Sequence, residues 1–416
     1  MSRPDLDSMR EKNTPADDHS AAAAAAGASC EQAVPTDGRG PAPMPEAARP
    51  LKIAMIGHKR VPGREGGVEV VVEELAGRMA AAGHSVTLYN RAAKGMPRHK
   101  EYAGARIITV PTINKKSLDA VIYSFFATLH AIFGRYDLIH YHALGPSVML
   151  ALAHLFGRRT AATVHGLDWQ RGKWGGFGSW YLKLGEKVIA RYADEVIVLS
   201  EGVQQYFRET YGRETVFIPN GVAAPMPAPP ALITEKWGLA GGDYILFLAR
   251  VVPEKGLHYL LEAYRGIKTD KRLVVAGGDS HSGDYWPMIQ KMAAEDPRVI
   301  LAGFAAGQLK AELLANAALY VLPSDIEGMP ISLLEAMRCG LPCLTSDIPE
   351  NTQLLGGFGA SFAKGDVAAL RVGLEKALES PPPAGEAQAE MIRAHYDWGE
   401  VARATLALYH KAAERS

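Results

Sequence analysis

Cysteine is scarce in this 416-residue chain, which contains only Cys30, Cys339 and Cys343. Three cysteines provide no disulfide framework, and their spacing matches no metal-binding pattern. We therefore expect reduced thiols that serve as packing residues in a cytosolic protein.

Long apolar runs are also missing, since none reaches the roughly 20 residues that a membrane-spanning helix requires. The nearest candidate covers residues 118–133, but it contains Asp119 and His130. It is better interpreted as a core or interfacial helix. Residues 1–50 are rich in Ala and Pro and include a six-alanine run that is too short for a signal peptide. Their composition predicts a disordered tail.

Net charge is absent as well, because 45 basic residues balance 45 acidic ones, but the two halves of the chain differ. Residues 51–220 hold 22 Lys and Arg against 14 Asp and Glu, a net charge of +8. Residues 221–416 hold 18 against 23, a net charge of −5. The basic first half favours an anionic partner such as a membrane surface or a lipid diphosphate. A random scatter of solvated Lys and Arg is an equal alternative.

Short β-rich runs alternate with helical patterns from residue 51 onward. In the first half the expected strands cover residues 51–57, 85–90, 106–111, 137–142, 160–166, 195–200 and 215–221. In the second half they cover residues 244–250, 272–278, 299–304, 318–324 and 342–347. Such alternation predicts an α/β protein with two Rossmann-like domains, each a parallel sheet covered by helices.

A Pro-rich stretch at residues 223–231 separates the two series, as an interdomain linker would. We place the first domain at residues 51–222, the linker at 223–236 and the second domain at 237–395. Residues 396–416 are expected to form a final amphipathic helix.

The most informative segment is residues 323–337, which read PSDIEGMPISLLEAM. The apolar run before it predicts a buried strand, Gly and Pro then break the chain, and a helix is expected from Ser332. Glu327 would lie in the loop and Glu335 on the helix, at the edge of the sheet where α/β proteins bind ligands. On their own, these two acids are more often a helix-dipole partner and a solvated residue than a site.

Two further loops follow the first expected strand of each series. The first contains Gly66 and Gly67 ahead of a helix, which lets backbone N–H groups approach a phosphate. A lone Gly-Gly pair is also typical of a plain turn. The second loop contains Arg250 and Lys255, two cations that can converge on a diphosphate and neutralise the charge of a departing nucleotide.

Histidines end two of the expected strands. His165 is followed by Asp168, Trp169 and Arg171, and the ring of Trp169 suits a sugar face, a lipid headgroup or simple packing. His140 and His142 share one face of their strand. No third ligand is placed near them, so packing and polar lining are favoured over a metal.

Segment 323–337 closely resembles the signature of retaining glycosyltransferases of family 4, which have the GT-B fold. Residues 249–256 (ARVVPEKG), 165–168 (HGLD) and 219–221 (PNG) resemble three further motifs of that family. The resemblance covers nearly everything after residue 50. It implies two Rossmann-like domains whose parallel sheets face a central cleft, with the acceptor on the first domain, the nucleotide sugar on the second, and the final helix crossing back to the first.

The resemblance also implies the site residues. Glu327, His165, Arg250 and Lys255 are the predicted catalytic residues: Glu327 contacts hydroxyls of the transferred sugar, His165 the sugar or its diphosphate, and the two cations the diphosphate. Glu335 is predicted on the ribose hydroxyls. The donor site is completed by Gly66, Gly67, Gly278, Phe304, Gly328, Met329 and Pro330. Asp168, Trp169 and Arg171 are predicted to contact the acceptor.

The implied activity is a retaining transfer of a hexose from a nucleoside-diphosphate sugar, without metal or other cofactor. A UDP-sugar is the first choice of donor, with GDP- and dTDP-sugars as alternatives. The acceptor would be a saccharide, lipid-linked or soluble, in the biosynthesis of bacterial polysaccharide, exopolysaccharide, lipopolysaccharide or glycolipid of the cell envelope. We expect a cytoplasmic protein, with peripheral binding to the inner face of the plasma membrane as a candidate, and no nucleic-acid partner.

Three alternatives remain at this point. A GT-B epimerase would release free sugar and nucleotide without an acceptor. A phosphorylase would need a lysine for pyridoxal phosphate, for which the sequence has no motif. A catalytically silent nucleotide-sugar-binding partner is disfavoured because all the expected polar residues are present in one chain.

Overall fold

The computed structural model describes residues 49–63, 66–93, 96, 98–113, 118–170, 176–278 and 283–414. The predicted N-terminal tail up to residue 48, with Cys30, lies outside these ranges. Arg171 also lies outside them.

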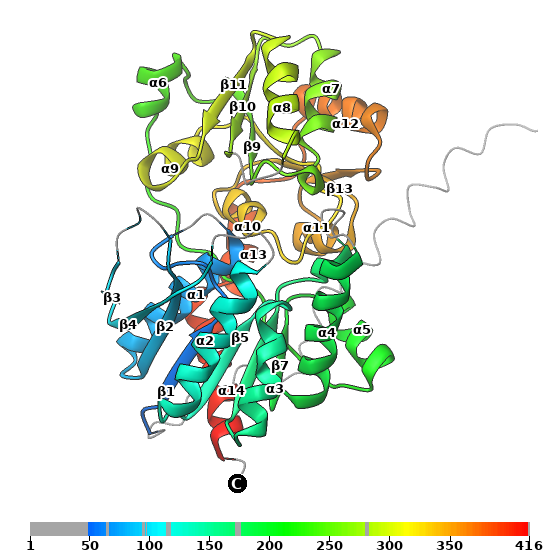
Figure 1. The fold of residues 1–416 in the computed structure, drawn as a ribbon. Coiled ribbons are helices and arrows are strands. Elements are labelled where there is room, and N and C mark those ends of the chain that lie inside the picture. Colours follow the sequence, from blue (N-terminus) through cyan, green and yellow to red (C-terminus); the bar gives the residue numbers. More distant parts are fainter. Residues whose placement is uncertain are drawn as a thin grey trace, which may run out of the picture. The chain divides into compact units, whose positions relative to one another are not determined.

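Two sheets form the framework of the protein (Figure 1). The first contains β1 (Lys52–Ile56), β2 (Ser85–Arg91), β3 (Glu101–Tyr102), β4 (Ala105–Val110), β5 (Leu138–His142), β6 (Thr160–Val164), β7 (Glu195–Val198) and β8 (Val216–Phe217). The second contains β9 (Tyr244–Leu248), β10 (Arg272–Ala276), β11 (Val299–Gly303), β12 (Leu319–Leu322), β13 (Cys343–Ser346) and β14 (Ala360–Phe362). Their strand orders are β3-β4-β2-β1-β5-β6-β7-β8 and β11-β10-β9-β12-β13-β14, and every pairing except β3 with β4 is parallel.

Helices connect the strands, as parallel pairing requires. Those between the strands of the first sheet are α1 (Gly67–Ala81), α2 (Asp119–Phe133), η1 (Pro146–Met149), α3 (Leu150–Leu155), η2 (Asp168–Gln170), α4 (Gly176–Tyr192) and α5 (Glu201–Tyr211). The second half adds α6 (Leu232–Trp237), η3 (Pro253–Lys255), α7 (Leu257–Arg265), α8 (Tyr285–Ala294), α9 (Gly307–Ala315), α10 (Ile331–Arg338), α11 (Pro349–Leu355), α12 (Val367–Glu379), α13 (Glu386–His395) and α14 (Trp398–Glu414).

Strand β1 shows why its segment is apolar throughout. Successive side chains of a strand point to opposite faces, and helices cover both faces of this sheet. Ile53 and Met55 therefore belong to one buried cluster, while Ala54 and Ile56 belong to the cluster on the other face. An uninterrupted apolar run is what such a strand needs.

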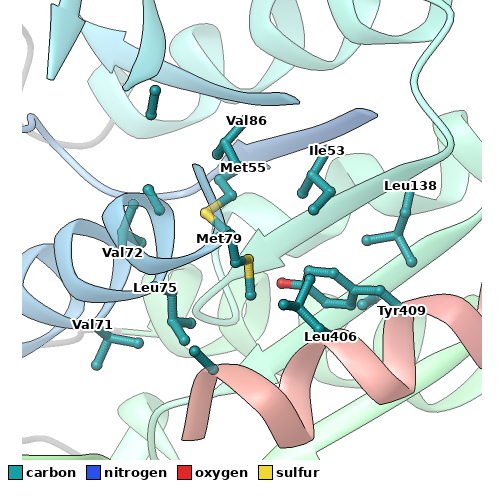
Figure 2. Close-up of a cluster of buried hydrophobic side chains, with 14 of the residues drawn as sticks. Ile53, Met55, Val71, Val72, Leu75, Met79, Val86, Leu138, Leu406 and Tyr409 are labelled. Carbon is teal, nitrogen blue, oxygen red and sulfur yellow. The ribbon is translucent and has the colours of Figure 1, made fainter. Parts of the chain in front are cut away.

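The final helix α14 completes the core of the first sheet (Figure 2). Its Trp398, Leu406 and Tyr409 are at most 2% exposed and share a buried cluster with Ile53 of β1 and Met79 of α1. The last segment of the chain thus packs against the elements that begin the described fold.

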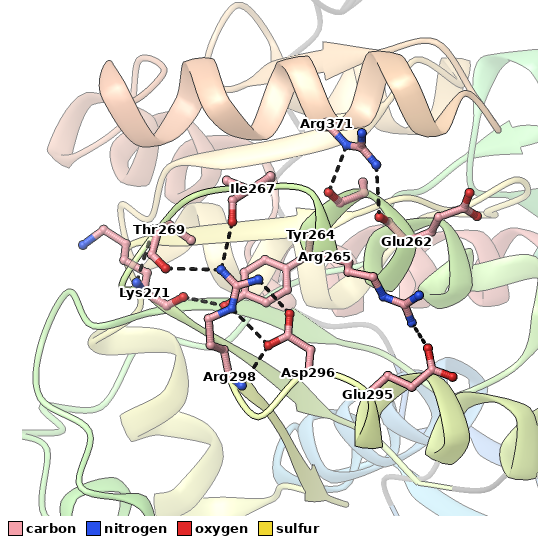
Figure 3. A network of polar contacts seen from close by, with 11 residues as sticks. Glu262, Tyr264, Arg265, Ile267, Thr269, Lys271, Glu295, Asp296, Arg298 and Arg371 are labelled. Atoms are coloured by element: carbon pink, nitrogen blue, oxygen red, sulfur yellow. Dashed lines mark hydrogen bonds and ion pairs between the residues drawn. The ribbon is translucent and has the colours of Figure 1, made fainter.

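The second sheet carries a polar network at the end opposite to the carboxyl ends of its strands (Figure 3). Arg298, directly before β11, donates to Asp296 Oδ2 at 2.7 Å and to the carbonyl of Ile267 at 2.9 Å. Its guanidinium also lies 4.6 Å from the ring centroid of Tyr264. These contacts hold the turn between α7 and β10.

Both sheets reverse their strand order beside their first strand. Strand β1 lies between β2 and β5, and β9 lies between β10 and β12. Loops at the carboxyl ends of strands diverge at such switch points and leave room for ligands. The loops after β1, β9 and β12 carry most of the predicted site residues.

The predicted α/β fold with two parallel sheets is confirmed, and the differences are local. The strand expected at residues 215–221 is reduced to β8, because Pro219 has no N–H to donate to a ladder. Segment 118–133 forms α2, which buries Tyr123 and Ala127 but exposes Phe133 to 68%. Among the described residues, no helix is both long and apolar enough to span a bilayer.

Candidate functional site

Glu327 and Lys255 meet at the switch point of the second sheet. Lys255 ends η3, after β9, and Glu327 lies in the loop after β12, so 72 residues of chain separate them. The Lys255 Nζ is 2.5 Å from Glu327 Oε1, and the two side chains are 15% and 6% exposed. The structure therefore joins the predicted diphosphate-binding cation to the predicted sugar-binding acid.

A chain of hydrogen bonds holds the Glu327 carboxylate in place. Ser324 Oγ donates to Glu327 Oε1 at 2.6 Å, Ser346 Oγ donates to the Ser324 carbonyl at 2.5 Å, and Asn351 Nδ2 donates to Ser346 Oγ at 3.1 Å. All of these side chains are buried. Glu327 Oε2 has no hydrogen-bond partner among the described residues, so this oxygen can accept from a ligand hydroxyl.

Glu335 lies about one turn into α10, and it pairs with a different cation. Lys310 Nζ of α9 is 2.6 Å from Glu335 Oε1, and both side chains are partly exposed, at 26% and 19%. Below them, Tyr320 OH donates to Ser332 Oγ at 2.8 Å, and burial raises the pKa of this phenol well above its ordinary value. The two predicted acids thus have separate partners.

The remaining predicted donor residues border the same edge of the second sheet. Arg250 follows β9 and is half-buried, and its guanidinium forms no hydrogen bond or ion pair with the described residues. Gly278 follows β10, and its carbonyl accepts from Val251 N at 3.4 Å. Phe304 follows β11 and is 56% exposed. These residues border the site without touching its centre.

Gly328 and His165 bring the loops of the two sheets into contact. A Cβ on Gly328 would lie 1.8 Å from the His165 carbonyl oxygen, which no side chain could tolerate. The neighbouring Met329 carbonyl accepts from Asn220 Nδ2 at 3.1 Å. Pro330 is the N-cap of α10. Glycine is therefore required at position 328 by close approach.

Gly66 and Gly67 also face this contact. Gly66 is the N-cap of α1, and a Cβ on Gly67 would lie 3.9 Å from Ile331 Cδ1 at the start of α10. Glu69 in the first turn accepts from Lys59 N at 2.9 Å. It therefore closes the loop after β1.

Buried imidazoles support His165 from behind. His142 Nδ1 lies 3.1 Å from His165 Nε2, and the rings of His140 and His142 have centroids 4.0 Å apart. His140 bonds to Thr163 Oγ1 at 2.8 Å and to Tyr409 OH of α14 at 2.5 Å. The interpretation of His140 and His142 as polar lining agrees with these contacts.

Burial fixes the protonation of these rings. It lowers the pKa of His140 to about 3, and it holds the pKa of His142 well below its ordinary value, with the neighbouring His140 adding to the effect. His142 Nε2 has no partner among the described residues, so we assign its proton to Nδ1, which donates to His165 Nε2.

Trp169 is held in place by its neighbours. It lies in η2, and its Nε1 donates to Glu186 Oε2 at 2.7 Å. Glu186 is fully buried and also accepts from Tyr206 OH at 2.8 Å and from Tyr211 OH at 2.5 Å. The Trp169 ring packs against the first sheet's core and under Lys183, while Asp168 stays half-buried beside it.

The described residues contain no group of three or more His, Cys, Asp or Glu side chains arranged to hold a metal ion. Cys339 and Cys343 are free thiols, and burial raises the pKa of Cys339 to about 11. The predicted packing role of these cysteines agrees with their burial.

Several supporting residues were not predicted from the sequence. Lys310, Glu186 and Ser346 act through partners that are 17 to 25 residues away in the chain. His142 and Asn220 had left a signal, because His142 alternates with His140 on an otherwise apolar strand and Asn220 lies in the PNG motif.

Comparisons with known proteins cover both sheets. The family model described as Glycosyltransferase Family 4 matches residues 65–224, and the model described as Glycosyl transferases group 1 matches residues 233–398. A GDP-mannose-dependent alpha-(1-6)-phosphatidylinositol monomannoside mannosyltransferase of Mycolicibacterium smegmatis is 27% identical over 353 residues, or 77% of this chain and 87% of that protein.

Two solved structures share the fold. The sucrose-phosphate synthase of Thermosynechococcus elongatus has a TM-score of 0.73 at 22% identity, covering 87% of this chain and 98% of that one. The Anabaena protein HepE in complex with UDP-glucose has a TM-score of 0.71 at 19% identity, covering 86% and 100%. With these matches over both sheets, the chain belongs to the group 1 glycosyltransferases with a Family 4 N-terminal domain, has the GT-B fold and uses a nucleotide sugar.

Proposed function

We propose that this glycosyltransferase is a retaining enzyme that moves a hexose from a nucleoside-diphosphate sugar to a saccharide acceptor without a metal ion. The observation that carries the proposal is the Lys255–Glu327 ion pair, which lies beside the contact between Gly328 and His165. A cation and a carboxylate thus lie at the switch point of the second sheet, next to the loop whose Gly328 approaches the backbone of His165, which supports this proposal.

The donor diphosphate would be held by Arg250 and Lys255. Lys255 already balances Glu327, so an added diphosphate needs further positive charge, which the half-buried Arg250 can supply. Cations fixed around a leaving group stabilise the charge that develops on it as the glycosidic bond breaks. This is why no metal ion is required in the proposed reaction.

The carboxylates would position the donor. The second oxygen of Glu327 can accept from a sugar hydroxyl, because Ser324 and Lys255 both bind the first oxygen. Glu335, held by Lys310, would accept from the ribose hydroxyls. Fixed orientation of this kind lowers the entropic part of the barrier. Both acids therefore act as positioning groups, and neither has to transfer a proton.

His165 would donate a hydrogen bond to the donor. Its Nε2 lies 3.1 Å from His142 Nδ1, a contact that would hold the ring in one orientation toward the sugar or its diphosphate. The acceptor hydroxyl would attack from the side of the leaving group, and the departing phosphate would take its proton. Retention of configuration follows from attack on that face.

The acceptor would lie over the first sheet, near Asp168, Trp169 and Arg171, and we propose that it is lipid-linked. The surface of α2 and α3 supports this idea, because five apolar side chains gather there with 40% to 79% exposure: Phe125, Phe126, Phe133, Leu155 and Phe156. We call this set the apolar strip. Its Phe133 and Phe156 rings have centroids 6.3 Å apart. Arg158 and Arg159 follow after Gly157, with Arg159 paired to Asp194 at 3.1 Å, and the proposed partner is an anionic membrane surface on the cytoplasmic side.

The donor and stereochemistry are tested with a panel of UDP-, GDP-, dTDP- and ADP-hexoses. A bound donor raises the melting temperature, mass spectrometry identifies the product, and NMR of the new linkage reports the anomeric configuration. We expect a UDP-sugar to give the largest shift, with a GDP-sugar as the alternative. EDTA should leave the rate unchanged. Inverted product, or loss of activity with EDTA that added Mg²⁺ restores, would contradict the proposal.

Matched variants exclude the rival functions. Glu327→Ala and Lys255→Ala should abolish transfer, whereas Glu375→Gln on the exposed face of α12 should not. Free sugar and nucleotide formed without an acceptor would indicate an epimerase. A melting shift without turnover on any acceptor would indicate a silent binding partner.

Membrane binding is tested separately by sedimentation with vesicles that contain phosphatidylglycerol. Wild-type protein should sediment with these vesicles and stay in solution with neutral phosphatidylcholine. Replacing Phe133 and Leu155 by serine should release it, while Val372→Ser, at a 63% exposed position on α12, should have no effect. Equal sedimentation of all variants would refute the role of the apolar strip.

A further inference from the structure

Three arginines line one small cavity on the first sheet, apart from the residues assigned so far. Arg60, Arg91 and Arg98 share its wall with Asn90 and Thr109. Arg60 lies in the loop after β1, Arg91 is the last residue of β2, and Thr109 is near the end of β4. Because these strands are parallel, the cavity opens at the carboxyl edge of the sheet, where Gly66 and His165 also lie.

The charge in this cavity is not balanced by the described residues. Arg91 Nη1 pairs with Asp119 Oδ2 at 3.2 Å, and the side chain of Arg91 is 15% exposed. Neither Arg60 nor Arg98 makes a side-chain hydrogen bond or ion pair with the residues that the structure describes. Three guanidinium groups are therefore matched by one carboxylate among the described residues, an excess of two positive charges.

Arg91 also offers an unused donor. Its Nε is buried, and no hydrogen-bond acceptor among the described residues reaches it. A buried N–H of a charged group destabilises the protein when it has no acceptor. A ligand that accepts a hydrogen bond from it removes this penalty, which favours binding. The Asn90 amide, by contrast, is fully used by His58 and Val61.

The size of the cavity defines what could enter. Its volume of about 10 Å³ is that of a single water-sized group. One oxygen of an oxyanion fits there, and the rest of the anion would lie at the mouth, where Arg98 is exposed and Arg60 is half-buried. Arginine forks suit tetrahedral oxyanions because they donate in pairs.

We infer that this cavity binds a phosphate group carried by the acceptor, as a monoester or a diester. The inference rests on the proposed function, because it names the class of acceptor that the first sheet would take. The phosphate would anchor the acceptor at Arg60, Arg91 and Arg98, so that its sugar hydroxyl reaches across Gly66 and Gly67 toward the donor.

The test measures binding of inorganic phosphate by titration calorimetry, with UDP and GDP both in excess so that the donor diphosphate site is filled. Wild-type protein should bind phosphate in a saturable way. Arg60→Gln and Arg98→Gln should each weaken binding at least about fivefold, since each removes one charge-assisted contact. These two variants are preferred to Arg91→Gln, because Arg91 also packs 4.9 Å from the Tyr123 ring centroid.

Arg135→Gln is the matched control. Arg135 is exposed and precedes β5, so it lies at the opposite edge of the same sheet. It should bind phosphate as the wild type does. Absence of saturable binding, or equal weakening in Arg135→Gln, would overturn the inference. Nucleotide binding measured on the same variants keeps the two proposals apart, because the inference requires it to stay unchanged whether or not transfer is observed.

The phosphate could come from a soluble sugar phosphate or from a lipid headgroup, and two arms of the experiment separate these sources. In the first, a soluble hexose phosphate and the neutral hexose are compared as acceptors. In the second, vesicles of phosphatidylinositol are compared with vesicles of a neutral glycolipid. If the wild type prefers the phosphorylated compound in one arm and Arg60→Gln loses this preference, that arm identifies the source of the phosphate. No preference in either arm would refute an acceptor phosphate.

Discussion

The two sheets present opposite kinds of chemistry at the place where their loops meet. The second sheet offers paired full charges, Lys255 with Glu327 and Lys310 with Glu335, on side chains that keep some contact with solvent. The first sheet offers neutral imidazoles, His140 and His142, which are completely buried. The second sheet therefore contributes charged groups to the site, and the first sheet contributes buried, hydrogen-bonded neutral groups.

This difference matches what each side would have to do. A diphosphate brings negative charge that changes during the reaction, so cations that can exchange partners suit it. Holding a neutral sugar in one orientation calls instead for fixed donors whose protonation does not vary. Burial of His142 behind His165 provides that constancy. The comparison predicts that mutations on the two sides will fail in different ways.

The largest effect is expected from the charged pair. Glu327→Gln and Lys255→Met should each lower kcat by about 10²- to 10³-fold, the range for losing one electrostatic contact to a transition state. The double variant should be little worse than either single one, because the two side chains act as a unit. Steady-state kinetics and circular dichroism would check both points. If the losses of the two single variants added up fully in the double variant, Glu327 and Lys255 would act independently of each other.

The second effect concerns acid stability of the imidazole side. Burial lowers the pKa of His58 from its ordinary value of 6.5 to about 4, and that of His140 to about 3. Between these values and pH 6.5, the histidines of the unfolded chain therefore bind protons that the same histidines do not bind in the folded protein. The free energy of unfolding should fall as the pH drops from 6.5, by about 1 kcal/mol for each histidine over the first pH unit.

Urea titrations at pH 6.5, 6.0 and 5.5 would measure this slope. His140→Gln removes one of these buried histidines, so its slope should be shallower than that of the wild type. A wild-type stability that rises toward pH 5.5 would contradict the buried neutral histidines.

A third, smaller effect is expected at His142, whose Nδ1–H is assigned to His165. His142→Leu should lower kcat by about tenfold, because the variant loses one hydrogen bond that positions His165. His142→Asn has a smaller side chain, but its amide N–H can stand where Nδ1–H was, so it should recover part of the loss. Equal activity of the two variants would mean that His142 only fills space.

The smallest effect on activity is expected from Arg298, far from the reacting groups. Arg298→Ala removes the hydrogen bonds to Asp296 and Ile267, so the melting temperature should fall by a few degrees. The KM for the donor and kcat should not change at temperatures well below melting. A raised KM would show that the turn it holds communicates with the site.

The fold could be predicted from the sequence because local patterns determine it. The alternating apolar runs located β1, β5, β9 and β12, and the Gly and Pro residues after β12 placed Glu327 in a loop. The short β14 was not predicted, since three residues with one buried side chain leave little pattern.

The partners within the site could not be predicted in the same way. Nothing near Lys255 in the sequence indicates Glu327, because the pair depends on β9 and β12 being neighbours in the sheet. The same holds for Trp169. The sequence was compatible with a sugar contact, a lipid contact or simple packing of its ring, and only the structure shows that the buried Glu186 accepts its hydrogen bond. Long-range polar contacts follow from topology, which residue patterns specify only in outline.

Helix α14 has a consequence for how the protein is made. Its Trp398 and Tyr409 fill the space beneath β1 and α1, which leave the ribosome more than 300 residues earlier. A nascent chain normally folds its first domain before the next is translated. Here the first sheet must wait, with part of its apolar surface uncovered, until α14 has been synthesised. Premature termination just before Trp398 would therefore damage the half of the molecule that was translated first.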